Sequence, residues 1–132
     1  MNELEEAIEL MQSGKLVECK SLLLDLLKLY PSNPTIWYQY AWVHDVMELE
    51  REAIPYYQKA LELGLQGEER QGALLGLGST YRTLGMYEQS KAIFEEAINE
   101  YPEQKEYAGS PPLAKSGGLI FHGRFDRMDF MQ

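Results

Sequence analysis

The stretch that decides the fold is LLGLGSTYRTLGMYEQSKAIFEEAINEYP, residues 74–102. Its apolar residues recur at the three- and four-residue intervals of an amphipathic helix on both sides of Gly85. Gly85 stands where a helix commonly ends in a left-handed residue, and Pro102 stands where the next helix must stop. The stretch therefore predicts two helices, near 68–84 and 87–101, joined by a short turn.

The residues before this stretch carry the same start and stop signals. Asn2, with Glu5 three residues later, forms a capping pair at the start of a helix, and Gly14 follows the end of that helix. Asn33 directly precedes Pro34, an N-cap followed by a proline at the first helical position. The chain is expected to form six helices, near 2–13, 16–30, 34–48, 51–63, 68–84 and 87–101.

Two features conflict with simple helices. Pro55 lies about one turn inside the fourth helix, so that helix is expected to start late or to bend. Gly72, Gly76 and Gly78 fall in the fifth helix, where each costs about 0.8–1 kcal/mol relative to alanine. Close packing of two helices explains Gly78, whereas Gly72 and Gly76 indicate either close approach of a ligand or a frayed first turn.

The helices align in pairs. Placing Gly14 on Gly85 superposes the two outer pairs, and the middle pair supplies matching residues in the same columns. The units are 34 residues apart from Cys19 to Ala53 and 37 apart from Ala53 to Ser90, which indicates a helical array with a short insertion near 64–70. In this alignment Cys19, Ala53 and Ser90 share one column, Leu23, Tyr57 and Phe94 a second, and Leu26, Ala60 and Ala97 a third.

These columns resemble the tetratricopeptide repeat, whose pattern is W-x2-L-G-x2-Y, then A-x3-F, a small residue and a closing proline. In the second unit Glu48 replaces the turn glycine and Leu65 the proline, and the first unit is degenerate in its opening helix. The third unit matches through Leu74, Leu77, Gly78, Tyr81, Ser90, Phe94, Ala97 and Pro102. The second matches through Trp37, Tyr40, Ala41, His44, Ala53, Tyr57 and Ala60, and the first through Ala7, Leu10, Cys19, Leu23, Leu26 and Pro31.

The resemblance implies an all-α fold, an α-solenoid of three TPR-like helical hairpins with an irregular C-terminal tail. The repeat domain is expected at 1–102, with units of about 1–33, 34–70 and 71–102. Residues 103–132 are rich in glycine and proline and carry no net charge, so they are expected to form a separate tail, either docked or disordered.

Composition limits the classes of function. The 132 residues carry a net charge of −9, which repels phosphate backbones and anionic lipid, so neither a nucleic-acid nor a membrane partner is expected. No apolar run reaches the roughly 20 residues of a membrane helix, and the acidic N-terminus has the wrong sign for a leader peptide. A lone cysteine, Cys19, allows no internal disulfide. The cytoplasm is the expected compartment.

The sequence contains no catalytic constellation, and it predicts no enzyme activity, no cofactor and no metal. Residues 76–80 superficially resemble a phosphate loop but lack its lysine and its preceding strand. Cys19 is best interpreted as a small buried filler and His44 as a packed core histidine. His122 stands alone in the tail, far in sequence from any second metal ligand.

In proteins of the resembled family, the first helix of each pair lines a concave groove that takes extended or helical peptides. The groove columns here are apolar and aromatic, so clamping of an acidic tail is not expected. An apolar or amphipathic peptide or helix carrying Lys or Arg fits better, with Tyr38 and Trp42 as anchors. The alternative is that Trp37, Tyr38, Tyr40 and Trp42 all serve core packing. The groove candidates are Leu4, Ile8, Met11, Tyr38, Trp42, Asp45, Leu75, Ser79 and Arg82.

The function indicated is therefore a non-catalytic protein-interaction module or scaffold with a protein or peptide partner. The second hypothesis is a self-assembly domain, a homo-oligomer built through the last helix or the tail. Residues 113–132 combine eight large apolar residues with Lys115, Arg124 and Arg127, so the tail can dock in its own groove, dock in a neighbour's groove, or remain disordered. The self-assembly or tail-docking candidates are Ile93, Ile98, Tyr101, Phe121, Phe125 and Phe130.

Overall fold

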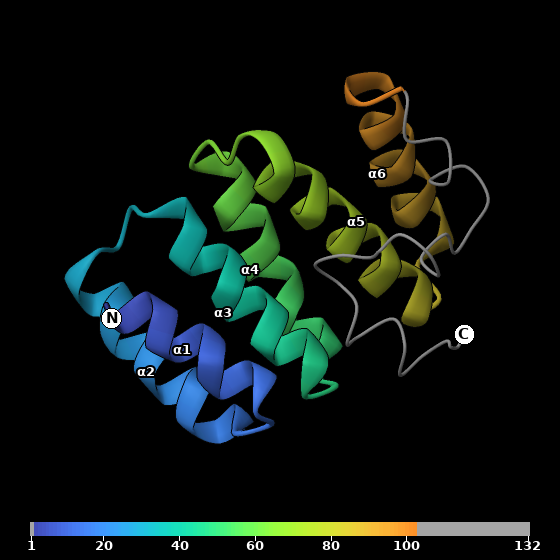
Figure 1. The fold of residues 1–132 in the computed structure, drawn as a ribbon. Helices are drawn as coiled ribbons and strands as arrows, with labels where there is room; N and C mark the ends of the chain where they lie inside the picture. Colours follow the sequence, from blue (N-terminus) through green and yellow to red (C-terminus); the bar gives the residue numbers. More distant parts are fainter. Residues whose placement is uncertain (1, 103–132) are drawn as a thin grey trace.

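The computed structural model describes residues 2–102, which form six helices and no strand (Figure 1). Every expected helix is confirmed, and each observed end lies within two residues of the expected one. The helices are α1 (Glu3–Gln12), α2 (Leu16–Leu29), α3 (Pro34–Val46), α4 (Glu50–Glu62), α5 (Gly67–Thr83) and α6 (Tyr87–Glu100).

Side chains cap the helices where the sequence indicated. The Asn2 side chain accepts a hydrogen bond from the Glu5 backbone N–H at 2.8 Å, and the Glu5 carboxylate accepts one from the Asn2 N–H at 3.3 Å. Asn33 Oδ1 accepts hydrogen bonds from the N–H groups of Thr35 and Ile36 at 2.9 and 3.2 Å. These contacts satisfy backbone donors that have no partner inside the helix, which fixes the starts of α1 and α3.

The helices pack as three consecutive hairpins, α1 with α2, α3 with α4 and α5 with α6 (Figure 1). Neighbouring hairpins meet through α2 against α3 and α4 against α5, and α3 also contacts both α1 and α5. This is an all-α helical-repeat array, in which each unit buries its apolar surface against the next unit along the chain.

Small residues allow the two helices of a hairpin to approach closely. A Cβ atom added to Gly78 would lie 2.8 Å from Cε1 of Phe94, so only glycine fits beside that ring. Ser90, the small residue of α6, donates a hydrogen bond to the Gly78 carbonyl at 2.8 Å. In the second hairpin the fully buried Ala41, Ala53 and Tyr57 occupy corresponding columns. The alternation of small and large residues that the sequence shows is therefore the packing of the core.

The structure decides part of the expectations about helix irregularities. α4 begins at Glu50, five residues before Pro55, so it does not start late; the exposed proline lies within the helix, and a bend there stays a prediction. Gly76 has a packing reason of its own, because an added Cβ would lie 2.7 Å from the Tyr57 hydroxyl oxygen. Gly72 is buried well inside α5, which excludes a frayed first turn there.

Candidate functional site

The nine groove candidates lie on α1, α3 and α5, the first helix of each hairpin. Within each helix they are spaced four and three residues apart, which places them in one stripe along that helix. α3 contacts both α1 and α5, so the three helices that carry the stripes are neighbours. We call this surface the α1–α3–α5 face. It consists of Leu4, Ile8, Met11, Tyr38, Trp42, Asp45, Leu75, Ser79 and Arg82.

An aromatic pair stands at the middle of this face. The rings of Tyr38 and Trp42 stack with centroids 6.2 Å apart and an angle of 19° between their planes. Tyr38 is buried, whereas Trp42 is half-buried and packs against the cluster that contains Leu74 and Leu75 of α5. The pair therefore joins the second hairpin to the third and keeps part of one large ring at the surface.

The other two aromatic residues of α3 belong to the core. Trp37 donates its indole N–H to the Pro31 carbonyl at 2.8 Å and packs on Tyr56 with ring centroids 5.9 Å apart. Tyr40 is buried, with its ring centroid 4.6 Å from that of His44. His44 is a buried core histidine, as expected, and desolvation lowers its pKa. Tyr38 also belongs to a core cluster and is 2% exposed, so on the α1–α3–α5 face only Trp42 of the four keeps part of its ring accessible.

A buried carboxylate lies one turn beyond Trp42. Asp45 is 0% exposed, and its Oδ2 accepts hydrogen bonds from the Tyr57 hydroxyl and from the Thr80 hydroxyl, each at 2.9 Å. Thr80 Oγ1 also donates to the Gly76 carbonyl at 2.8 Å, which fixes the position of the Thr80 side chain. Hydroxyl groups of α4 and α5 therefore hold the Asp45 carboxylate of α3 in the core, and these hydrogen bonds offset part of the cost of its burial.

The stripe of α5 combines apolar, hydroxyl and cationic groups. Leu75 and Ser79 are buried, and Ser79 Oγ has no hydrogen-bond partner among the described residues. The Arg82 guanidinium is half-buried and lies over the Phe94 ring, 5.6 Å from its centroid. This contact orients a cation at the far end of the stripe from Leu75.

The stripe of α1 packs separately from the other two. Leu4 and Met11 are half-buried against the cluster that includes Leu23 and Val43, in the core between the first two hairpins. Ile8 is also half-buried. The structure thus packs Trp42 of α3 against the cluster that contains Leu75 of α5, and it places Leu4 and Met11 of α1 in a second apolar group beside α3.

Comparisons with known proteins agree with this architecture. The chain matches the family model described as tetratrico peptide repeat over residues 34–111. The chain belongs to the tetratricopeptide repeat (TPR) family. No curated protein matches the chain. Among solved structures it is similar to YrrB, a TPR protein described as having an unusual peptide-binding site, with a TM-score of 0.71 and 23% identity over 80% of this chain. The chain spans about half, 53%, of the length of that YrrB chain.

The TPR pattern missed the hydroxyl groups that hold Asp45. Tyr57 occupies a column where the repeat pattern requires only a large side chain, and Thr80 lies at a position that the pattern does not specify. One signal was present, since the corresponding residues in the other hairpins are Leu23 and Phe94, which carry no hydroxyl. A polar variant of an apolar column indicates a buried hydrogen bond.

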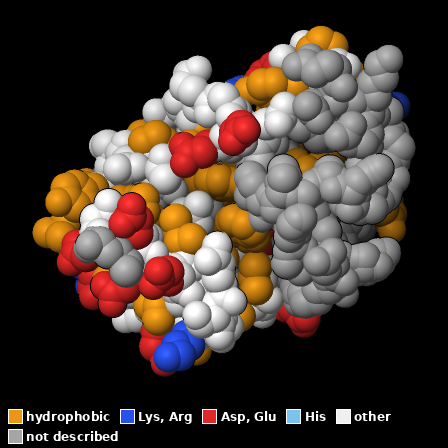
Figure 2. Space-filling model, viewed as in Figure 1, with side chains coloured by type: hydrophobic (Ala, Val, Ile, Leu, Met, Phe, Trp, Pro, Cys, Tyr) orange, Lys and Arg blue, Asp and Glu red, His pale blue; other side chains and the backbone are white. Residues whose placement is uncertain are grey.

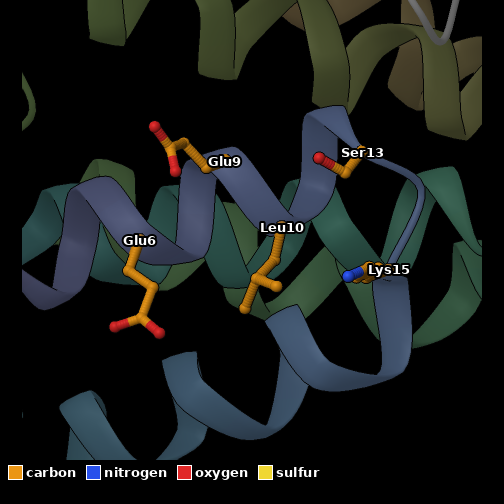
Figure 3. A pocket seen from close by; sticks show the side chains of 5 residues that line it. All are labelled: Glu6, Glu9, Leu10, Ser13 and Lys15. Carbon is orange, nitrogen blue, oxygen red and sulfur yellow. The ribbon is translucent and has the colours of Figure 1, made fainter.

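A pocket of about 400 Å³ lies between α1 and the start of α2 (Figure 3). Glu6 and Glu9 project from α1, and Lys15 precedes α2. None of the nine groove candidates lines this pocket, and it offers no aromatic surface. It is therefore a polar hollow at the end of a hairpin. Its lining residues are Glu6, Glu9, Leu10, Ser13 and Lys15.

The remaining candidates of the sequence have defined positions. Cys19 is a buried filler as expected, and burial raises the pKa of its thiol to about 11. Ile93, Ile98 and Tyr101 are half-buried against the core of the third hairpin. Within residues 2–102 there is no group of three potential metal ligands and no helix able to cross a membrane. Phe121, Phe125, Phe130 and His122 lie outside the described residues.

Proposed function

We propose that this TPR chain is a protein-interaction module whose α1–α3–α5 face binds an apolar or amphipathic peptide or helix carrying Lys or Arg. The observation that carries the proposal is the buried carboxylate of Asp45 next to the stacked pair of Tyr38 and Trp42. An aromatic surface supplies contact area at low entropic cost, and a carboxylate beside it selects a cation.

The charge of the whole chain supports the same partner. The net charge of −9 attracts basic segments and speeds their association. Figure 2 shows hydrophobic side chains gathered on the visible face with acidic side chains nearby. The description of YrrB as a TPR protein with a peptide-binding site supports a peptide partner of this fold, although it does not name a sequence.

The selectivity for cations is tested by Asp45→Asn, which keeps the size of the side chain and its acceptor oxygen but removes the charge. The probe is an array of 15-residue peptides with equal apolar content and either Lys or Glu at the polar positions. We expect the full chain to capture the Lys peptides, and Asp45→Asn to weaken that capture about tenfold, a typical effect of losing one close charge pair. Equal capture of Lys and Glu peptides would contradict the proposal.

Two further variants complete this experiment. Asp25→Asn removes the same charge from an exposed position on α2, so it is expected to leave peptide affinity nearly unchanged. Trp42→Ala removes the half-buried ring and is expected to abolish capture of both peptide sets while the helical circular dichroism is retained. Extensive unfolding of Trp42→Ala would instead assign Trp42 to the core.

A further inference from the structure

The exposed large apolar side chains among residues 2–102 are concentrated on one helix. Four of the five lie on α2 or directly after it, and only Tyr87 lies elsewhere, on α6. The four are Val17, Leu24, Leu29 and Tyr30, each between 41% and 66% exposed. A single exposed apolar residue is ordinary, whereas several on one element indicate a contact surface.

The exposed residues of α2 form one continuous face. Half of its 14 residues are exposed, and at about 100° per residue they fall within an arc of about 140° opposite the core. Ser21 lies at the middle of this arc, where its small side chain allows a second helix to approach closely. We call this surface the α2 outer face. It consists of Val17, Glu18, Ser21, Leu24, Asp25, Lys28 and Leu29.

The fold does not require apolar residues on this face. In the alignment of the three hairpins, the positions of Val17 and Leu24 hold exposed polar or charged residues on the other two second helices. These residues are Arg51 and Gln58 on α4 and Glu88 and Glu95 on α6. The repeat therefore accepts charge at both positions, and α2 is the helix that departs from this pattern.

A further repeat would not cover the α2 outer face. Hairpins meet through the second helix of one and the first helix of the next, α2 with α3 and α4 with α5. A unit placed before α1 by the same rule would contact α1 and leave the outer face of α2 exposed. An occupant of this face therefore comes from outside the array.

The charges of α2 favour a second copy of the chain as that occupant. Its two acidic and two basic residues cancel, so α2 adds nothing to the repulsion between two chains of net charge −9. Glu18 lies five residues before Leu23, and Lys28 lies five residues after it. When two copies of α2 pack in opposite directions about Leu23, Glu18 of each lies at the height of Lys28 of the other. Packing in the same direction would instead oppose like charges.

The apolar residues are arranged about the same centre. Val17 lies six residues before Leu23 and Leu29 six residues after it, so the two are at the same height in antiparallel copies. Leu24 lies next to the centre, close to Leu24 of the other copy. Burial of these side chains favours association, and the opposite charges set its direction.

We propose that two copies of this chain associate through the α2 outer face, antiparallel and related by a two-fold axis. Such a contact is self-complementary, because both copies use the same residues. α2 is 14 residues long, about 21 Å, so the interface is small, below about 1,200 Å², and the dimer is weak, with a Kd on the order of 100 μM. The interface shares no residue with the α1–α3–α5 face, so the dimer is independent of the proposed function.

Sedimentation of the full chain at two concentrations tests the dimer. We expect mainly the monomer mass at about 10 μM and mainly the dimer mass at about 1 mM. The double variant Val17→Glu with Leu24→Glu gives α2 the residues that α6 carries at these positions. We therefore expect it to keep its helical circular dichroism and to weaken the dimer at least tenfold, because the contact would bury four unpaired carboxylates.

The matched control is the double variant Gln89→Glu with Asn99→Glu, which adds the same charge at exposed positions of α6 and is expected to keep the dimer. A monomer mass for the unaltered chain at about 1 mM would overturn the proposal. Persistence of the dimer in the α2 variant would do the same. Loss of the dimer in both variants would show that net charge governs association, which would overturn the assignment to α2.

Exchange of charges tests the antiparallel arrangement. Glu18→Lys opposes two lysines at each end of the contact, and Lys28→Glu opposes two glutamates, so each is expected to weaken the dimer about fivefold. Combining both substitutions in one chain restores opposite charges and is expected to recover the affinity. An equal mixture of the two single variants is expected to form a heterodimer of the original affinity. Unchanged affinity in both single variants would overturn the antiparallel pairing.

Discussion

Glu48 is the one residue other than glycine with a positive φ within residues 2–102. It lies in the turn between α3 and α4 with φ of 66°, in the left-handed region. At the corresponding turns of the other hairpins, Gly14 and Gly85 have φ of 82° and 80°, and an added Cβ would meet nothing within 4 Å. The geometry of the turn is therefore common to all three hairpins, and only the middle one places a side chain there.

Replacing Glu48 with glycine is expected to stabilise the protein by about 1 kcal/mol, because a non-glycine residue in the left-handed conformation carries a strain of that order. Urea denaturation followed by circular dichroism measures the change as a higher midpoint at constant slope. Gly85→Ala imposes the reverse change at a matching turn and is expected to destabilise by a similar amount. A lower midpoint for Glu48→Gly would show that the side chain of Glu48 outweighs the backbone strain.

The sequence predicted the columns of the core at the residue level, but not the contacts of Asp45. Periodicity fixes which helix face a residue occupies, and that was sufficient for Cys19 and His44. The hydroxyls of Tyr57 and Thr80 reach Asp45 from two other helices, α4 and α5. These contacts exist only because the second and third hairpins stack on each other. A single sequence without this geometry does not contain the distances that define such a site.

The helix α5 is the element that sequence periodicity describes least well. All residues from Gly72 to Tyr81 are buried, so the helix lacks the polar stripe that marks a surface helix. Its bounds were nevertheless predicted, because the signals that end helices are local. The sequence interpretation of Gly76 was wrong because the ring of Tyr57 on α4 leaves no room for a Cβ atom at this position. That neighbour is known only from the tertiary structure.

A cluster of charges ties the start of α5 to the end of α6. Arg70 Nε lies 2.7 Å from Glu100 Oε1, and Arg70 Nη2 lies 2.9 Å from Glu100 Oε2 and 3.1 Å from Glu96 Oε2. The hydrogen bond from Arg70 is the main cause that lowers the pKa of Glu100. Because the two helices close the third hairpin, this cluster fixes their relative position at the end remote from the Gly85 turn.

The lowered pKa of Glu100 gives the stability of this hairpin a defined pH dependence. The contribution is complete above the ordinary pKa of glutamate and is lost as the pH falls through the lower pKa of the folded state. Arg70→Gln is expected to lower the free energy of unfolding by at most about 1 kcal/mol at pH 7 and by almost nothing at pH 3. Lys59→Gln, which breaks an exposed pair with Glu62, is the control and is expected to have little effect at either pH. A difference that persists at pH 3 would contradict this account.

On the scale of the whole molecule, burial is concentrated in the middle of the array. α3 and α5 each bury a large share of their residues, whereas Ala7 is the one buried residue of α1. In a repeat array the total stability is approximately a sum of unit and interface contributions, so the units need not open together. The first hairpin, whose opening helix buries only Ala7 among the described residues, is the unit expected to open most easily.

Native-state hydrogen exchange measures this gradient directly. We expect the amides of α1 to exchange faster than those of α3 and α5. Ala7→Gly, at a fully buried position, is expected to weaken the first hairpin by about 1 kcal/mol and to speed exchange in α1 and α2 about fivefold, with little change in α5. Ala97→Gly applies the same substitution at a fully buried position of α6 and should instead speed exchange in the third hairpin. If each variant accelerated all six helices equally, the chain would open as one cooperative unit, and local stability would not follow the order of the repeats.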